Sequence, residues 1–163
     1  MGVCNLHDVD GIGLTRHHAG GAPTAATLQA VGIAGQALQV SPVAQGEDYI
    51  LVGDQVLKEV TEVIRGSIRR TDILARYGGE EFAILLPMTP LEGAVVEGER
   101  IRQAIRTHAF GADVGPVHMT ISLGVSAFPA ARVGSVEDLI ARADDALYQA
   151  KAEGRDRLVA SAD

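Results

Sequence analysis

The chain has few of the residues that mark secreted, membrane-spanning or nucleic-acid-binding proteins. Its single cysteine, Cys4, cannot form an internal disulfide, which fits a reducing compartment, and we expect the cytoplasm. Only 14 lysines and arginines stand against 21 acidic residues, and this net charge of −7 argues against sequence-independent binding to DNA or RNA. No apolar run approaches the roughly 20 residues that span a bilayer, and the N-terminus lacks the pattern of a signal peptide.

Size and composition indicate one globular domain with two unlike parts. Its 163 residues, 47% of them hydrophobic, suit a single substantial core. Residues 49–163 show clear periodicities and form the predicted domain core, whereas residues 1–48 form an altered N-terminal part. Residues 20–45 contain no acidic residue. Residues 25–38 permit a helix, although two glycines weaken it.

The most informative segment is a predicted β-hairpin with an acidic tip. Two apolar runs, residues 73–75 and 82–86, flank the sequence Gly78-Gly79-Glu80-Glu81. Paired glycines allow positive φ and let a bulky ligand lie against the backbone. A carboxylate beside them can hold a hard cation, which can in turn hold phosphates. An ordinary solvated turn is the alternative interpretation of these residues alone.

Helical and strand periodicities surround the hairpin. The predicted helices cover residues 56–64, 91–105 and 139–150, and the further strands cover residues 117–128 and 157–160. We expect the first helix to begin at Asp54 as its N-cap, and Ser135 to Asp138 resembles a capping box before the last helix. The order of elements indicates an α+β fold, with helices packed on a mostly antiparallel sheet.

Five ordered motifs resemble those of the GGDEF family, the diguanylate cyclases, in its GGEEF variant. They are Gly53 to Leu57, Arg69 to Asp72, Arg76 to Phe82, Thr120 to Val125, and Ala143 to Lys151 followed by Gly154 to Arg157. The resemblance covers residues 49–160. It implies a β-α-β-β-α-β sheet like that of the polymerase palm and the adenylyl cyclases, with helices packed around it.

The resemblance also implies an activity and its residues. Members condense two GTP molecules into cyclic di-GMP and pyrophosphate, as a homodimer in which each subunit presents one GTP. Glu80 is implied as the ligand of Mg²⁺ or Mn²⁺, and Glu81 as its partner in the catalytic centre. The implied substrate contacts are Asp54 to guanine, Gly78 and Gly79 beside the triphosphate, and Lys151 and Arg155 to phosphate. The implied inhibitory site for cyclic di-GMP comprises Arg69, Asp72 and Arg100.

Plain structural roles remain open for several of these residues. Asp54 could serve only as an N-cap. Lys151 and Arg155 would share a face of a continuing helix and could be solvated charges favoured by the helix dipole. Arg69 and Asp72 could form a surface ion pair, worth about 0–1 kcal/mol.

An expected metal ligand is missing. Counted back from Asp54 without a gap, Ala37 stands where the family has a second metal-binding aspartate. Magnesium is usually held by one or two carboxylates plus substrate phosphates, so this loss should weaken metal binding. The chain is then either a weakened cyclase or a catalytically degenerate module that binds cyclic di-GMP or GTP as a sensor.

Residues 17–48 resemble nothing in the family, although family-like sequence precedes and follows them. A shifted reading frame or an artificial junction would leave this pattern. Resequencing the coding DNA tests that hypothesis, because the family's missing segment should then appear in another frame.

Overall fold

A computed structural model of the chain describes residues 4–5, 31–37, 48–78, 80–111, 118–128, 130 and 133–161. The strands are β1 (Cys4–Asn5), β2 (Val31–Ala37), β3 (Ile73–Gly78), β4 (Glu81–Leu85), β5 (Ile121–Ala127) and β6 (Leu158–Ala160). The helices are α1 (Asp48–Ser67), α2 (Leu91–Thr107) and α3 (Val136–Ala152). No helix within these ranges is both long and apolar enough to cross a membrane.

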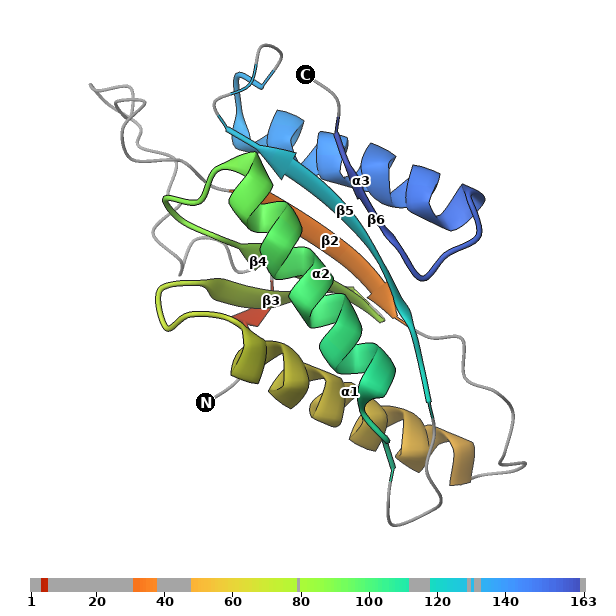
Figure 1. The fold of residues 1–163 in the computed structure, drawn as a ribbon. Coiled ribbons are helices and arrows are strands. Elements are labelled where there is room, and N and C mark those ends of the chain that lie inside the picture. Colours follow the sequence, from red (N-terminus) through yellow and green to blue (C-terminus); the bar gives the residue numbers. More distant parts are fainter. Residues whose placement is uncertain are drawn as a thin grey trace.

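All the strands lie in one sheet, in the order β1-β3-β4-β2-β5-β6 (Figure 1). The segment from β2 to β5 runs β2-α1-β3-β4-α2-β5, so the expected β-α-β-β-α-β arrangement is confirmed. This is the split β-α-β topology, in which each crossover helix joins two parallel strands that have a third strand between them. α3 then joins β5 to the parallel strand β6.

β2 corrects the expectation of a helix over residues 25–38. Residues 31–37 form a strand that pairs antiparallel with β4 on one side and with β5 on the other. Each glycine in this segment would cost a helix about 1 kcal/mol, whereas a central strand gains ladder hydrogen bonds along both edges. The part of the chain that least resembles the family therefore supplies the middle of the sheet.

The start of α1 corrects a second expectation. The helix begins at Asp48, so Asp54 lies inside it and is not its N-cap. The apolar helical periodicity begins only at Val56 and so does not reveal the first turns of this helix. The side chain of Asp54 lies outside the described part of the structure.

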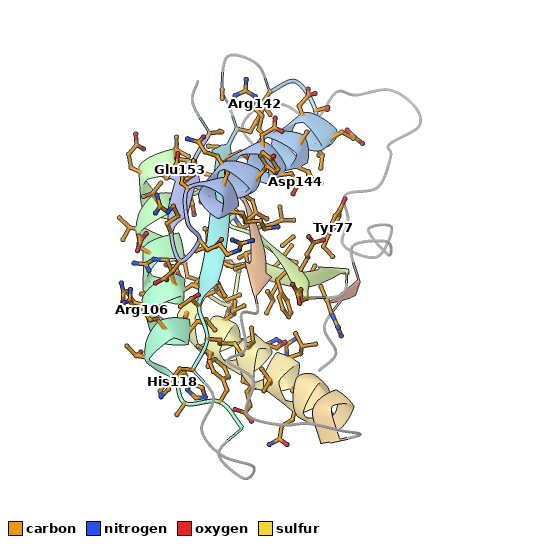
Figure 2. All side chains as sticks on the ribbon, turned by 90° about the vertical axis from the view of Figure 1, so that its right-hand side faces the viewer. Tyr77, Arg106, His118, Arg142, Asp144 and Glu153 are labelled. Carbon is orange, nitrogen blue, oxygen red and sulfur yellow. The ribbon has the colours of Figure 1, made fainter. Side chains whose placement is uncertain are left out.

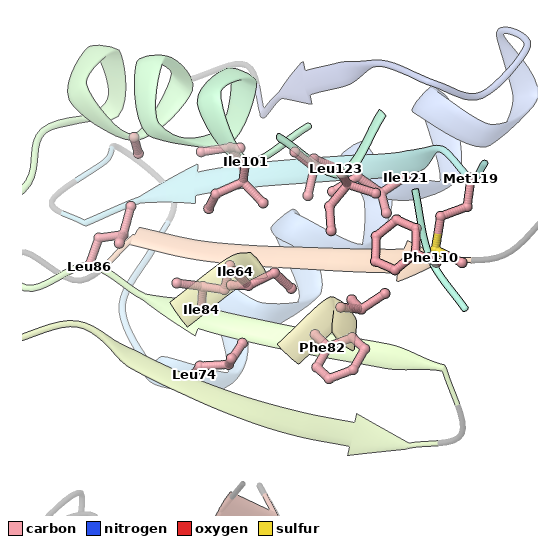
Figure 3. Close-up of a cluster of buried hydrophobic side chains, with 14 of the residues drawn as sticks. Ile64, Leu74, Phe82, Ile84, Leu86, Ile101, Phe110, Met119, Ile121 and Leu123 are labelled. Carbon is pink, nitrogen blue, oxygen red and sulfur yellow. The ribbon is translucent and has the colours of Figure 1, made fainter. Parts of the chain in front are cut away.

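Apolar side chains from α1, α2 and three strands form the main core (Figure 3). On β5, Ile121, Leu123 and Val125 are buried in this cluster. Alternate residues of a strand point to opposite faces, and Gly124 and Ser126 face α3 instead. The Ser126 hydroxyl donates to the Leu139 carbonyl of α3 over 2.6 Å. The sheet thus has α1 and α2 on one face and α3 on the other.

The remaining predicted elements are confirmed, with shifted ends. α2 extends two residues beyond the expected Ile105, and α3 begins after Ser135, whose hydroxyl accepts from the Asp138 amide over 3.1 Å. The Asp138 carboxylate accepts from the amide of Gly134, at 3.0 Å. Ser135 therefore caps the helix as the capping box predicts. Asp138, however, binds the amide of Gly134 and not that of Ser135.

Candidate functional site

The β3–β4 hairpin contains a register shift near its tip. Arg76 pairs with Phe82 and the next pair is Gly78 with Glu81, so the pairing register shifts between Arg76 and Gly78. Such a bulge bends the strand and redirects side chains, and bulges are common beside active sites. Tyr77 is 40% exposed at this point (Figure 2). The tip is therefore an irregular turn and not a plain continuation of the ladder.

The two glutamates of the tip occupy different positions. Glu80 lies in the turn and is half-buried, while Glu81 is the first residue of β4. Phe82 and Ile84 are buried in the main core, so Glu81 points to the opposite face, the one that α3 covers. Gly79, predicted to make room for a triphosphate, lies outside the described residues.

The carboxyl group of Asp144 in α3 interacts electrostatically with Glu81 of this hairpin. Burial raises the pKa of the Asp144 carboxyl, the charges of Glu81 and Asp145 raise this pKa further, and the charge of Lys151 opposes the shift. Glu81, Asp144 and Lys151 therefore lie in one electrostatic environment on the α3 side of the sheet. Asp144 is largely exposed on α3, and nothing in a single sequence shows which strand a helix covers, so its proximity to Glu81 emerges only from the fold.

The strand beside the hairpin brings no carboxylate to it. Gln36 of β2 pairs with Glu81, the first residue of β4. Ala37, the last residue of β2, and Glu80, in the turn before β4, are the next residues along the chain. Within the described residues, no three His, Cys, Asp or Glu side chains are grouped closely enough to hold a metal ion. Magnesium accepts one or two carboxylates when substrate phosphates complete its shell. Glu80 therefore fits as a metal ligand only together with a phosphate-bearing ligand.

The predicted phosphate-contacting residues lie at the end of α3. Lys151 occupies its last turn, but the helix ends at Ala152, so the expectation that it continues to Arg155 is wrong. The Arg155 amide donates to the Ala150 carbonyl over 3.0 Å and the Gly154 amide to the Lys151 carbonyl over 3.4 Å, with Gly154 at φ 113°. This is a Schellman ending, which favours glycine in the left-handed conformation.

The three residues of the predicted inhibitory site meet at the C-terminal end of α1. The Asp72 carboxylate accepts from the Arg69 amide over 2.7 Å, and the Arg69 side chain is exposed. From α2, the Arg100 guanidinium donates to the carbonyl of Ser67, two residues before Arg69, and forms an ion pair with Glu97. Two arginines from different elements thus lie near one turn.

Sequence reasoning missed a cluster around Asp156. Arg102 and Arg106 of α2 both bind its carboxylate, with Nη1–Oδ distances of 2.6 and 3.0 Å. The contacting residues are separated by 54 and 50 positions in the chain. No periodicity or local motif links residues that far apart, so this contact could not be predicted from the sequence.

Comparison with known proteins agrees with this arrangement. Residues 50–157 match the family described as "Diguanylate cyclase, GGDEF domain". The chain is 45% identical over 108 residues to diguanylate cyclase DgcP of Pseudomonas aeruginosa, which covers 66% of this chain and 16% of that protein. It is 41% identical over 113 residues to the response regulator PleD of Caulobacter vibrioides, covering 68% and 25%.

Solved structures match a larger share of the chain than these relatives do. The active GGEEF domain of a diguanylate cyclase from Vibrio cholerae has a TM-score of 0.65 at 27% identity, over 82% of this chain and 83% of that one. The GGDEF domain of DgcB from Caulobacter crescentus, in complex with c-di-GMP, has a TM-score of 0.66 at 27% identity, over 83% and 77%. Although the chain spans only a small part of the two curated relatives, its acidic hairpin, its sheet order and these matches agree: it belongs to the GGDEF family of diguanylate cyclase domains.

Proposed function

We propose that the chain is a diguanylate cyclase domain that condenses two GTP molecules into cyclic di-GMP. The observation that carries this proposal is the Gly-Gly-Glu-Glu sequence at the bulged tip of the β3–β4 hairpin, in a domain of this family. Each 3′-hydroxyl attacks the α-phosphate of the other GTP, and pyrophosphate leaves. This chemistry requires in-line placement of the attacking oxygen and neutralisation of phosphate charge.

We assign roles to residues as follows. Gly78 and Gly79 leave room for the triphosphate, and Glu80 holds Mg²⁺ or Mn²⁺, with Glu81 completing the catalytic centre. Lys151 and Arg155 bind phosphate oxygens, and Asp54 binds guanine. When bound, the metal supplies charge neutralisation on the phosphates. These assignments rest on the motif match, and the half-buried position of Glu80 and the exposure of Arg155 support them.

The reaction requires two copies of the chain. One hairpin presents one GTP, so two subunits must face each other to bring each hydroxyl to the other's phosphate. We therefore propose a homodimer during turnover, in the cytoplasm, where GTP is available.

We further propose that cyclic di-GMP inhibits the enzyme through Arg69, Asp72 and Arg100. A guanidinium is a planar fork that matches phosphate oxygens and guanine edges. The support is twofold. The Asp72 carboxylate is held by the Arg69 amide in the turn after α1, and the Arg100 guanidinium binds the Ser67 carbonyl two residues before Arg69.

A second candidate function is a catalytically degenerate module that binds cyclic di-GMP or GTP without turnover. Gln36 and Ala37 favour it, because they leave the hairpin without a carboxylate from β2. Incubation of the pure protein with GTP and Mg²⁺, followed by an assay for cyclic di-GMP, separates the two functions. Product above background supports the cyclase, and its absence together with cyclic di-GMP binding supports the module.

A further inference from the structure

The turn after α3 is held in an unfavourable backbone conformation. Arg155 and Asp156 have φ values of 62° and 43°, directly after Gly154 at 113°. Aspartate enters the left-handed region more readily than most residues, whereas arginine has no such tolerance. Consecutive non-glycine residues of this kind persist only where surrounding structure fixes them, and such strain is common at ligand-binding turns.

The ends of this turn are anchored by backbone hydrogen bonds. On the helix side, the Schellman ending ties the Arg155 amide to Ala150. On the strand side, the Leu123 amide donates to the Arg157 carbonyl over 2.9 Å, where β6 joins the sheet. The two residues with positive φ lie between these anchors.

Side chains of α2 hold the middle of the turn. Arg102 Nη1 donates to Asp156 Oδ1 over 2.6 Å and to the Asp156 carbonyl over 3.1 Å. One guanidinium therefore fixes both the side chain and the backbone of a strained residue. Arg106, labelled on α2 in Figure 2, adds a contact to Oδ2 at 3.0 Å. Its side chain is 54% exposed, against 11% for the side chain of Arg102.

The Arg102 contacts are of the stronger kind. Hydrogen bonds between ionised partners are about twice as strong as neutral ones, and Arg102 also binds Glu99 at 2.9 Å. Burial acts to lower the pKa of Arg102, but the hydrogen bonds and charges of Glu99 and Asp156 outweigh it and raise the pKa. Arg102 therefore stays charged at any pH at which the protein works.

We infer that Arg102 is a positioning residue: by holding Asp156 it keeps the turn in its left-handed conformation and so aims the adjacent, exposed Arg155 at the phosphates of GTP. The inference rests on the proposed function, because it takes Arg155 as a phosphate contact. Arg102 itself is half-buried, binds the carboxylates of Glu99 and Asp156, and acts through Arg155 without touching the nucleotide.

Calorimetric titration with GTP and Mg²⁺ tests this inference on the full chain. Arg102→Gln should weaken GTP binding about 10- to 100-fold, the effect of a lost charged hydrogen bond. Arg106→Gln is the matched control, because it removes a contact to the same carboxylate from an exposed side chain, and it should change binding by no more than about threefold. The loss of affinity caused by Arg102→Gln should be smaller for GMP than for GTP, because GMP offers fewer phosphate oxygens for Arg155 to contact.

A double-mutant cycle separates positioning from general damage. If Arg102 acts through Arg155, then Arg102→Gln should add almost nothing to the loss caused by Arg155→Gln. Asp156→Ala should weaken GTP binding as much as Arg102→Gln does. If Arg102→Gln does not fold, Asp156→Ala takes its place in the test. Asp156→Asn should bind GTP better than Asp156→Ala, because asparagine tolerates the left-handed region and keeps a hydrogen-bond acceptor for Arg102.

The outcomes distinguish the two levels of the proposal. If the wild type binds GTP and folded Arg102→Gln binds it equally well, the positioning role alone is overturned. The same holds if the losses from Arg102→Gln and Arg155→Gln are fully additive. Failure of the wild type to bind GTP would overturn the proposed function and this inference with it.

Discussion

Gly124 of β5 lies directly beneath the backbone of α3, so that a Cβ at this position would lie 2.0 Å from the Ala143 carbonyl oxygen. The same Cβ would lie 2.3 Å from the Leu147 amide nitrogen. Both contacts are with backbone, which cannot rotate away. The absence of a side chain at this one position therefore sets how closely α3, with Asp144 and Lys151, approaches the sheet.

Gly124→Ala should destabilise the fold by about 3 kcal/mol or more, because the whole of α3 must move outward. Urea unfolding measures the loss. Gly66→Ala is the control, since nothing lies within 4 Å of its Cβ position in α1, and it should stabilise by about 0.5 kcal/mol. Equal stabilities for the two variants would show that α3 is not tightly packed on β5.

Asp144→Asn should stabilise the protein at neutral pH. The pKa of Asp144 is raised above its ordinary value of 3.8, so the folded state holds the proton more tightly than the unfolded state. The wild type therefore has its full stability from this group below pH 3.8 and loses it as the pH rises through the folded-state pKa. Asparagine avoids that loss. The gain in the free energy of unfolding should be about 0.5 kcal/mol or less, because the Asp144 side chain is largely exposed.

The measurement for Asp144 is the free energy of unfolding of both proteins from pH 3 to pH 7. The difference should be present at pH 7 and should fade toward pH 3. Glu62→Gln, an exposed acidic residue on α1, controls for the change in net charge. A difference that is the same at every pH, or equal to that of Glu62→Gln, would contradict the account.

Arg69→Ala should weaken cyclic di-GMP binding about 10- to 100-fold, as expected for a lost charged hydrogen bond. Arg70→Ala removes an equally exposed neighbouring charge and should cost no more than about threefold. Calorimetry with cyclic di-GMP measures both. If the two variants bind alike, general charge and not the proposed site attracts the ligand.

Ala37→Asp should raise the rate of cyclic di-GMP formation. It places a carboxylate on β2 one residue past the Gln36–Glu81 pair. A second ligand should improve metal binding, and a gain of about tenfold corresponds to 1.4 kcal/mol, well within what a metal supplies. Ala37→Asn has nearly the same shape without the charge and should give no gain at low Mg²⁺. Equal rates for both variants would mean that β2 does not face the metal.

The sequence predicted the parts of the fold that local patterns determine. The hairpin follows from its glycines and flanking apolar runs, and α3 follows from its apolar stripe and its Ser135 cap. β2 was missed because its two glycines and weak periodicity carry no strand signal, and pairing with β4 and β5 decides its structure. Tertiary contacts of this kind routinely override local propensity.

Some residues of the candidate site could be predicted from local motifs, and others could not. Motif spacing led to Glu80 and to the arginines at the end of α1. The start of α1 was misplaced because Asp54 matches a capping residue in type, whereas the helix begins at Asp48. The contact between Arg102 and Asp156 joins residues 54 positions apart, which only the folded chain brings together.

We propose that the acidic hairpin makes this domain a cyclase, although β2 supplies no carboxylate. The most direct test is the formation of cyclic di-GMP from GTP and Mg²⁺ by the wild type and by Glu80→Gln. We expect the wild type to form product slowly, at a rate that rises more steeply than linearly with protein concentration because two subunits react together. We expect Glu80→Gln to form no product. No product from the folded wild type, or equal product from both proteins, would contradict it.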